Sequence, residues 1–342
     1  EPTAFPIEWD AAGDPVQDWD RTNHLYYGGI AFNRAKPANA SIWVARYNWN
    51  APFAVPDYEF TTLVSRGTPG AAGIFEDKVE LGVDIGTASP HEGNVYVCWA
   101  RFTGNGNNAI ELATSSDGGE TFKIQRISDG VHGNQSCDIA VTKTGKVFVT
   151  WRQFEFTPGA DVPQKQRDAV IWVRSDNGGR SFTKPAEAFK FVHWDMTDRT
   201  LGGGSARDCG DGPFHCPSDF VFARIPLEVR IAADQSGGLA GVYLAYMEVR
   251  PDSIVASTSS YFSAGPGLVG QSLVYLLRST NNGATWSAPT PVDPQPVGHQ
   301  FFPDLDLLDG TLAVMWQDSR TDPAYSVQHP IGNTSLGFSC GC

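Results

Sequence analysis

A turn that occurs three times is the feature of this sequence that most restricts its fold. The segment 115–122 reads SSDGGETF, and related segments stand at 175–182 (SDNGGRSF) and 279–286 (STNNGATW). Internal repetition of this kind predicts a fold made of similar supersecondary units. The recurring positions are Ser115, Asp117, Gly119, Phe122, Ser175, Asn177, Gly179, Phe182, Ser279, Asn281, Gly283 and Trp286.

Each repeated turn lies between two predicted strands. An apolar stretch precedes every turn, and a second repeated stretch, apolar and ending in an aromatic residue, occurs at 95–99, 147–151, 242–246 and 312–316. A shorter strand and a tight turn come before each copy of this second stretch. The pattern indicates a unit of four strands, A to D, in which the repeated turn joins strand C to strand D.

Four-stranded units of about 40–50 residues without helices are typical of a β-propeller. We therefore predict an all-β fold, a β-propeller of four-stranded antiparallel blades, in a single domain over residues 1–342. Blades are expected near 14–64, 78–128, 136–192 and 228–293, with only the A and B strands of a fifth, whereas a complete ring would hold about six. Either the sequence stops before the ring is complete or another subunit covers the open edge, and a long insertion is expected at 193–227.

Composition and charge exclude several classes of function. The 36 Gly and 23 Pro residues favour many turns. The 25 Lys and Arg against 38 Asp and Glu leave a net charge of -13, which repels nucleic-acid phosphate and anionic lipid, so we predict no nucleic-acid partner. No apolar stretch approaches the roughly 20 residues that span a bilayer, and the start resembles a mature N-terminus after removal of a signal peptide.

The six cysteines point to disulfides and not to a metal site, because none belongs to a CxxC pair. Cys209 and Cys216 bracket a short loop rich in Gly and Pro. Cys98 lies on a B strand and Cys137 on the next A strand, where a bridge between blades is geometrically reasonable. The partners of the cysteines at 340 and 342 stay open. Disulfides favour a secreted, extracellular protein.

The repeated turns resemble the Asp-box, or BNR repeat, of the sialidase superfamily. The segments 93–99, 299–304 and 316–320 are similar to secreted bacterial exo-α-sialidase-like proteins. The resemblance covers most of the chain through the blade pattern. It implies a glycoside hydrolase that holds the substrate carboxylate with three arginines, attacks with a tyrosine primed by a glutamate, and uses an aspartate as acid and base. Asp-boxes lie at the periphery of the ring and also occur in non-enzymatic propellers.

Long connections fall at 153–168, 193–227, 249–271 and beyond 317, all of them B–C or D–A loops on one face, so we predict the functional surface there. Most charged candidates lie near the ends of B strands, whereas Arg224 belongs to an Arg-Ile-Pro segment that matches the family motif. The other interpretation of the arginines is that they are solvated charges or members of ion pairs. The other interpretation of Tyr246 is that it belongs to the core. The substrate-binding candidates are Arg101, Arg152, Arg224, Arg250 and Arg320, and the catalytic candidates are Tyr246, Glu248 and Asp318.

We expect a secreted glycoside hydrolase that acts on sialic acid or a related acidic sugar, with no required cofactor. The alternative is a non-catalytic propeller that binds glycans or proteins, as a subunit of an extracellular assembly. The seven histidines are scattered, which argues against a transition-metal site. A structural calcium ion has candidate oxygen ligands in Asp195, Asp198, Asp208 and Asp211, but their spacing matches no known calcium loop, which favours a solvated acidic loop.

Overall fold

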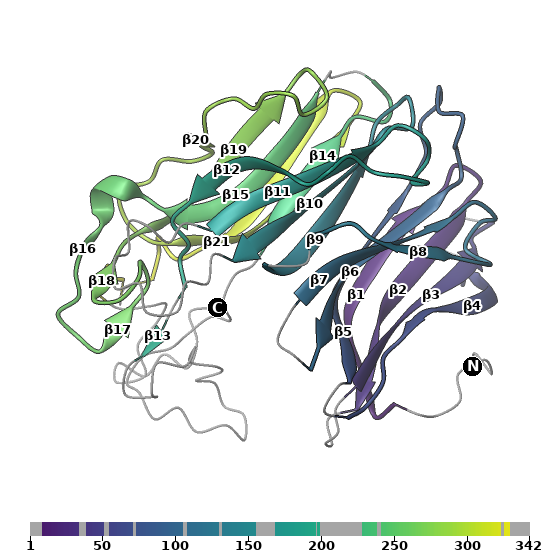
Figure 1. The fold of residues 1–342 in the computed structure, drawn as a ribbon. Coiled ribbons are helices and arrows are strands. Elements are labelled where there is room, and N and C mark those ends of the chain that lie inside the picture. The colour runs from purple at the N-terminus through teal and green to yellow at the C-terminus, as the bar shows by residue number, and fades with distance from the viewer. Residues whose placement is uncertain are drawn as a thin grey trace.

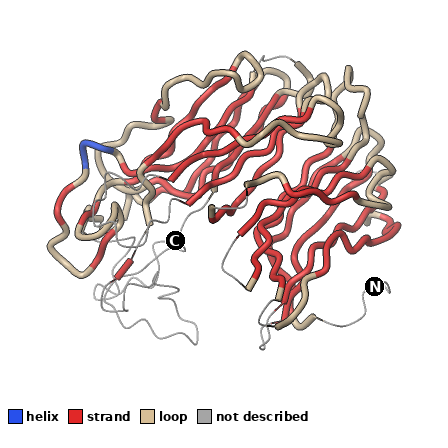
Figure 2. The backbone as a smooth tube through the Cα atoms, viewed as in Figure 1, coloured by secondary structure: helices blue, strands red, loops and turns tan. Residues whose placement is uncertain are grey.

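The fold consists almost entirely of β-strands (Figure 2). The computed structural model describes residues 9–33, 39–50, 55–70, 73–104, 108–129, 132–154, 168–195, 197–198, 228–237, 241–322 and 325–328. Within these ranges one short 3₁₀ helix occurs, at Pro251–Ser253. No described helix has the length and apolar character needed to cross a membrane.

Four sheets of four antiparallel strands follow one another along the chain (Figure 1). In each sheet the strands pair in chain order, as the sequence predicts. Blade 1 contains β1 (Ala11–Trp19), β2 (His24–Asn33), β3 (Asn39–Asn48) and β4 (Asp57–Arg66). Blade 2 contains β5 (Ile74–Val83), β6 (Val95–Thr103), β7 (Asn108–Ser115) and β8 (Lys123–Arg126).

The later blades repeat this pattern and carry small additions. Blade 3 contains β9 (Gly133–Val141), β10 (Val147–Phe154), β11 (Asp168–Ser175) and β12 (Ala186–Phe191), and blade 4 contains β14 (Val229–Ala233), β15 (Val242–Val249), β19 (Ser272–Ser279) and β20 (Thr290–Pro291). Blade 5 has two described strands, β21 (Gln300–Leu308) and β22 (Thr311–Asp318). The short strands β13 (Thr197–Asp198), β16 (Val255–Ala256), β17 (Tyr261–Phe262) and β18 (Leu268–Val269) form two separate pairs.

The first strands of successive blades contact one another, in the order β1, β5, β9, β14 and β21, as expected for sheets arranged radially about an axis. An apolar core fills each of the four spaces between consecutive described blades. Gln235, after β14, accepts a hydrogen bond from the backbone of Ile85 and donates one to Val83, so blades 2 and 4 also meet near the axis. The predicted β-propeller is therefore confirmed.

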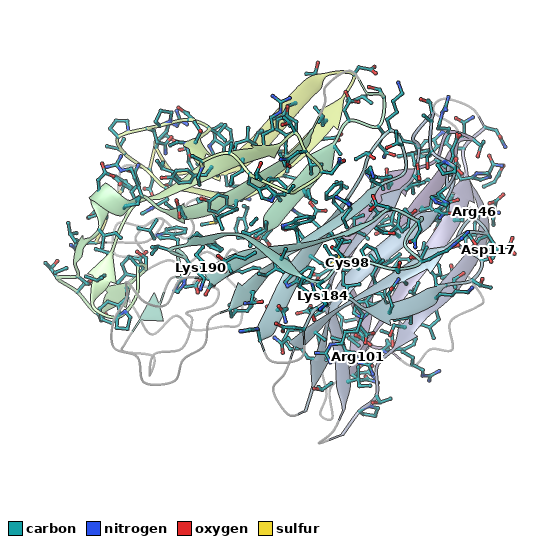
Figure 3. The ribbon with its side chains drawn as sticks, turned by 45° about the horizontal axis from the view of Figure 1, so that its top comes forward. Arg46, Cys98, Arg101, Asp117, Lys184 and Lys190 are labelled. Carbon is teal, nitrogen blue, oxygen red and sulfur yellow. A yellow bond between two sulfur atoms is a disulfide. The ribbon has the colours of Figure 1, made fainter. Side chains whose placement is uncertain are left out.

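A disulfide joins Cys98 on β6 to Cys137 on β9, as the sequence predicts. Both cysteines are buried in the core between blades 2 and 3, and Figure 3 shows Cys98 in the interior of the sheets. The other predicted pair, Cys209 with Cys216, lies outside the described residues. The bridge ties the second strand of blade 2 to the innermost strand of blade 3.

The three repeated turns are closed by the hydrogen bonds that their sequence predicts. In the first, Ser115 Oγ accepts from the Gly119 amide at 2.8 Å, and Asp117 accepts from the amide and hydroxyl of Thr121 at 3.0 and 2.5 Å. The turns at 175–182 and 279–286 repeat the two bonds from backbone amides, but there the asparagine amide donates to the hydroxyl of Ser181 or Thr285.

Each repeated turn also binds the blade before it. Arg46 of blade 1 donates to the Gly118 carbonyl, Thr114 of blade 2 to Gly179, and Arg174 of blade 3 to Asn282. Figure 3 places Arg46 and Asp117 together at the outer edge of the blades, and Arg101 at the other end of blade 2. The turns are therefore structural clamps between neighbouring blades.

Replacing Cys98 and Cys137 together with alanine should lower the free energy of unfolding. The bridge closes a loop between residues 39 positions apart, for which chain entropy gives a stabilisation of about 4 kcal/mol. Urea unfolding without reductant measures the difference. Coincident unfolding curves for the variant and the wild type would contradict a stabilising bridge.

Gly179→Ala should destabilise the protein more than Gly93→Ala does. Both glycines have a positive φ, 79° and 87°, so alanine costs about 1–2 kcal/mol at either position. At Gly179 a Cβ atom would also lie 2.6 Å from Thr114 Oγ1 and 2.9 Å from Tyr96, whereas at Gly93 it meets open space. Overpacking should add about 1–3 kcal/mol at Gly179 alone. Equal losses in urea unfolding would show that the turn does not clamp the blades.

Candidate functional site

The strands nearest the axis share an unusual backbone feature. β1, β5, β9 and β21 each contain a bulge, and the first bulged residue is a non-glycine with positive φ: Asp14 (48°), Lys78 (55°), Ser136 (59°) and Phe302 (53°). Such a conformation costs on the order of 1–3 kcal/mol and is concentrated at functional sites. Bulges also redirect side chains next to active sites. The repeated strain therefore marks the bulged stretches of these inner strands as a candidate site.

A cavity of about 160 Å³ opens where three of these bulges meet. It is smaller than the roughly 300–1,000 Å³ typical of ligand pockets, and suits one small ring-sized group. Its walls come from the first halves of β1, β5 and β9 and from the start of β14. The lining residues are Asp14, Pro15, Val16, Lys78, Val79, Glu80, Ser136, Cys137, Glu228 and Arg230.

The cavity lies at the end of the blades that carries the predicted loop-rich face. The first half of β5 pairs with the last half of β6, where the B–C connection begins, as the pairing of Glu76 with Arg101 shows. The D–A connections enter at the same end, because they lead into the A strands. Long connections and the cavity thus share one end of the propeller.

One arginine faces three carboxylates beside the cavity. Arg230 bonds the Glu80 carboxylate, and its Nε atom lies 3.6 Å from Asp304. The carboxylate of Asp138 interacts with the same guanidinium. Burial and the charge of Asp138 outweigh Arg230 and raise the pKa of Glu80 to about 7. Glu80 can therefore hold or release a proton near neutral pH.

The cavity is also lined by two more carboxylates and one lysine. Lys78 Nζ lies 3.5 Å from Glu228 Oε1, and the Lys78 amide donates to Asp14 at 3.2 Å. Both cations of the cavity are thus paired with carboxylates of the cavity. Together with Glu80, the Asp14 and Glu228 side chains give the site three carboxyl groups from three blades, an arrangement suited to general acid and base chemistry.

Arg152 lies at the predicted end of its blade, but it belongs to a cluster of ion pairs. Its guanidinium is buried and lies 2.5 Å from Asp168 and 2.9 Å from Asp195. His193 lies 3.7 Å from both carboxylates. The atoms of Asp168, His193 and Asp195 are close enough to hold a metal ion, but Arg152 already occupies the two carboxylates, so this donor set does not fit a divalent cation.

The other predicted substrate-binding arginines within the described ranges are also paired. Arg101 lies 2.9 Å from Glu111, and Arg250 lies 2.8 Å from Asp252. Arg320 is 42% exposed and bonds Asp318 and Asp293 at 2.6 and 2.5 Å. The ion-pair interpretation of these arginines therefore agrees with the structure.

The structure brings Arg250, Arg320 and Asp318 into one neighbourhood through Gln295. The side-chain amide of Gln295 donates to Asp318, and the backbone carbonyl of Gln295 accepts from Arg250 at 3.5 Å. Burial opposes ionisation of Asp318, but bonds from Arg320, Trp316 and Gln295 lower its pKa to about 2. An aspartate with so low a pKa is ionised at neutral pH and is a poor proton donor.

Tyr246 and Glu248 lie side by side, but the tyrosine is in the core. Tyr246 is 1% exposed. The centroid of its ring lies 4.4 Å from that of Phe189 and 5.4 Å from that of Phe191. Burial, and then the charge of Glu248, raise the pKa of Tyr246 far above its usual range. A phenol held neutral in this way is a weak nucleophile, so the placement agrees with the core interpretation.

Several sequence-based predictions concern residues that the structure does not describe. Arg224, Cys209, Cys216 and most of the insertion 193–227 lie outside the described residues, as do Asp208 and Asp211 of the proposed calcium site. Of that site the side chain of Asp195 is described, and it binds Arg152. The calcium prediction stays open for the rest.

Sequence reasoning missed the axial residues, although a signal was present. When the A strands are aligned on their bulges, Glu80, Asp138 and Asp304 occupy one position, and Arg230 holds the corresponding place in β14. A charged residue at this one offset in β5, β9, β14 and β21 indicates a polar axis, although β1 has Val16 there. Asp14, Lys78 and Glu228 lie just before this position.

No protein-family model matches the chain, and no curated protein matches it. The α-L-arabinofuranosidase Arb93A of Fusarium graminearum is similar in structure, at 9% identity over 88% of this chain and 72% of that one, with a TM-score of 0.50. The Hadza microbial sialidase Hz136 aligns at 10% identity over 91% of this chain and 64% of its own length, with a TM-score of 0.44. Trypanosoma rangeli sialidase aligns at 9% identity over 90% of this chain and 43% of its own, with a TM-score of 0.46. Similar structures therefore include glycoside hydrolases, and the likeness to Arb93A agrees with the propeller fold.

Stability should fall as pH rises above 6.5 in a way that depends on His193. Burial alone would lower the pKa of His193, but Asp195 and Asp168 outweigh it and raise that pKa above 6.5. The folded protein then binds the proton more tightly than the unfolded chain, so the stabilisation is complete below pH 6.5 and is lost as pH rises through the folded-state pKa. His193→Gln should weaken this dependence in urea unfolding, whereas His132→Gln, at a half-exposed site, should keep it in full. An unchanged pH profile in His193→Gln would contradict the assignment.

Proposed function

We propose that this protein is a glycoside hydrolase whose active site is the axial cavity. The observation that carries the proposal is the group of carboxyl side chains in a small strained cavity on the propeller axis, one of which has a pKa near 7. Hydrolysis of a glycosidic bond needs one carboxylic acid that protonates the leaving oxygen and a second carboxylate that acts as base or nucleophile.

Glu80 is the proposed proton donor. Its pKa of about 7 keeps a large protonated fraction at neutral pH. After the proton leaves, Arg230, which lies in direct contact with Glu80, stabilises the resulting carboxylate. Asp14 and Glu228, which also line the cavity, are the candidates for the second carboxylate.

A neutral sugar fits the cavity better than sialic acid does. Recognition of a substrate carboxylate favours an arginine fork that is not already neutralised. In the cavity Lys78 is paired with Glu228 and Arg230 with Glu80, and the cavity wall carries more carboxylates than cations. Neither cation of the cavity is therefore left over to bind an anionic sugar.

A sialidase activity, on sialic acid or a related acidic sugar, is the second candidate. The observation that favours it is the adjacency of Tyr246 and Glu248, which matches the tyrosine and glutamate pair implied by the resemblance. It requires that the core around Tyr246 open to substrate. The disulfide between Cys98 and Cys137 supports a protein that acts outside the cytoplasm.

Purified protein should hydrolyse at least one neutral aryl glycoside in a panel that includes arabinofuranosides, xylosides, galactosides and a sialoside. Glu80→Gln should lower kcat about 10²–10⁴-fold, because the proton donor is lost. In the wild type, kcat should fall as pH rises above 7, where Glu80 loses its proton. Glu59→Gln, which removes an ion pair with Arg46 away from the cavity, should leave kcat unchanged.

Three results distinguish the alternatives. Turnover of the sialoside alone, reduced in Tyr246→Phe, would favour the sialidase reaction. Turnover that Glu80→Gln leaves intact would remove Glu80 from the mechanism. A folded protein without turnover on any glycoside would support the non-catalytic binding propeller.

A further inference from the structure

Blades 2 and 3 carry acidic residues at the same offset of their inner strands. In chain order, the residues at this offset in β1, β5, β9, β14 and β21 are Val16, Glu80, Asp138, Arg230 and Asp304. Arg230 stands between two acidic neighbours, so the interfaces on both sides of it are attractive. Among the described blades, Glu80 and Asp138 are the one consecutive pair of like charge, and two carboxylates that share a site repel each other.

The disulfide lies at this same interface, beside the acidic pair. Cys98 is the residue of β6 that pairs directly with Glu80, so the two side chains share one face of the sheet, with Cβ atoms roughly 4.5–5.5 Å apart. On β9, Cys137 directly precedes Asp138 and lines the axial cavity together with Glu80. The bridge thus joins β6 to β9 at the level of the two carboxyl groups.

The packing of the blades does not by itself require a covalent bond at this place. The other interfaces between described blades are closed by apolar cores. The residues that correspond there to the two cysteines are Gly28 with Val79, Thr150 with Val229, and Ala245 with Pro303. The described disulfide is therefore found at the interface whose inner strands carry like charges.

The charged groups that face Glu80 come from three other strands. Those that act on it directly are Arg230 on β14, Asp138 on β9 and Asp304 on β21. The remaining charged groups of the cavity are Asp14, Lys78 and Glu228, of which the lysine is paired with Glu228. Of the three direct neighbours, Asp138 belongs to the strand that the disulfide ties to blade 2.

The carboxylate of Asp138 is itself fixed in place. It accepts hydrogen bonds from the amides of Ile139 and Ile231, both at 2.8 Å, and rotation of the side chain would sacrifice both bonds. The effect of its charge on Glu80 therefore depends on how far β9 lies from blade 2, because the Coulomb energy falls with distance and with the entry of water.

We propose that the bridge between Cys98 and Cys137 is a positioning element, which holds the carboxyl groups of Glu80 and Asp138 in one cluster against their repulsion. Without the bridge the two strands move apart, water enters between the carboxyl groups, and both ionise. The pKa of Glu80 then falls toward its ordinary value, and the cavity loses its proton donor near neutral pH. The catalytic consequence rests on the proposed function, whereas the control of the Glu80 proton does not.

Titration of the Glu80 carboxyl carbon by ¹³C NMR, in the wild type and in variants without the bridge, tests the proposal. Cys98→Thr/Cys137→Val is the main variant, because it introduces the residues that stand at the corresponding positions between blades 3 and 4. Its Glu80 midpoint should lie about one pH unit or more below that of the wild type. Cys98→Ala/Cys137→Ala should show the same shift.

Gly179→Ala is the matched control for lost stability. This substitution disturbs a clamp at the rim, where Thr114 binds the Gly179 carbonyl, and leaves the bridge intact. Its Glu80 midpoint should equal that of the wild type. A general loosening of the fold would instead lower the midpoint in this variant as well, and would contradict a specific role of the bridge.

Asp138→Asn distinguishes positioning from a merely structural role. Once the charge of Asp138 is removed, the bridge has no repulsion to resist at this place. Opening the bridge in the Asp138→Asn background should therefore shift the Glu80 midpoint much less than it does in the wild-type background.

The proposal is overturned if the folded variants without the bridge keep the wild-type midpoint, or if the full shift persists in the Asp138→Asn background. Loss of folding in both cysteine variants would reduce the bridge to a structural requirement and equally overturn it. Failure of the proposed function looks different, because the midpoint would then shift as expected while no glycoside is hydrolysed. Where a glycoside is hydrolysed, the pH above which kcat falls should move down together with the Glu80 midpoint.

Discussion

The packing of each blade against the next about a common axis is the constraint on which the rest of the structure depends. The apolar cores between blades draw on both faces of blades 2, 3 and 4, so the inner strands cannot separate without exposing two cores. The disulfide between Cys98 and Cys137 and the clamps of the repeated turns add fixed points at the axis and at the rim. This rigidity supports the strained bulges that form the cavity.

The axial charges follow from the same packing. Inner strands of several blades converge, so charged side chains at one offset must share a small volume of low solvent access. One guanidinium then faces the carboxylates of Glu80, Asp138 and Asp304. Because a single positive charge cannot balance three negative charges, a carboxyl group in this cluster keeps its proton to higher pH. The cavity chemistry is thus a consequence of the radial architecture.

The local parts of the structure could be read from the sequence, whereas the axial site could not. The repeated turns are closed by bonds within eight residues, such as Ser115 to Gly119, so their pattern survives as a motif. The cavity depends on pairs such as Arg230 with Glu80, 150 positions apart, and on bulges at Asp14 and Lys78 that carry no glycine signal. The arginines at the B-strand ends were visible, but their carboxylate partners, such as Asp168 for Arg152, become apparent only when the side chains are placed.

The central physical claim is that burial and neighbouring carboxylates hold a proton on Glu80 near neutral pH. The most direct measurement is the titration of the side-chain carboxyl carbons by NMR after selective ¹³C labelling of glutamate, with the Glu80 signal assigned by its absence in Glu80→Gln. The account predicts a midpoint near pH 7 for this signal. A midpoint near the value of about 4.3 for an unperturbed glutamate would contradict it.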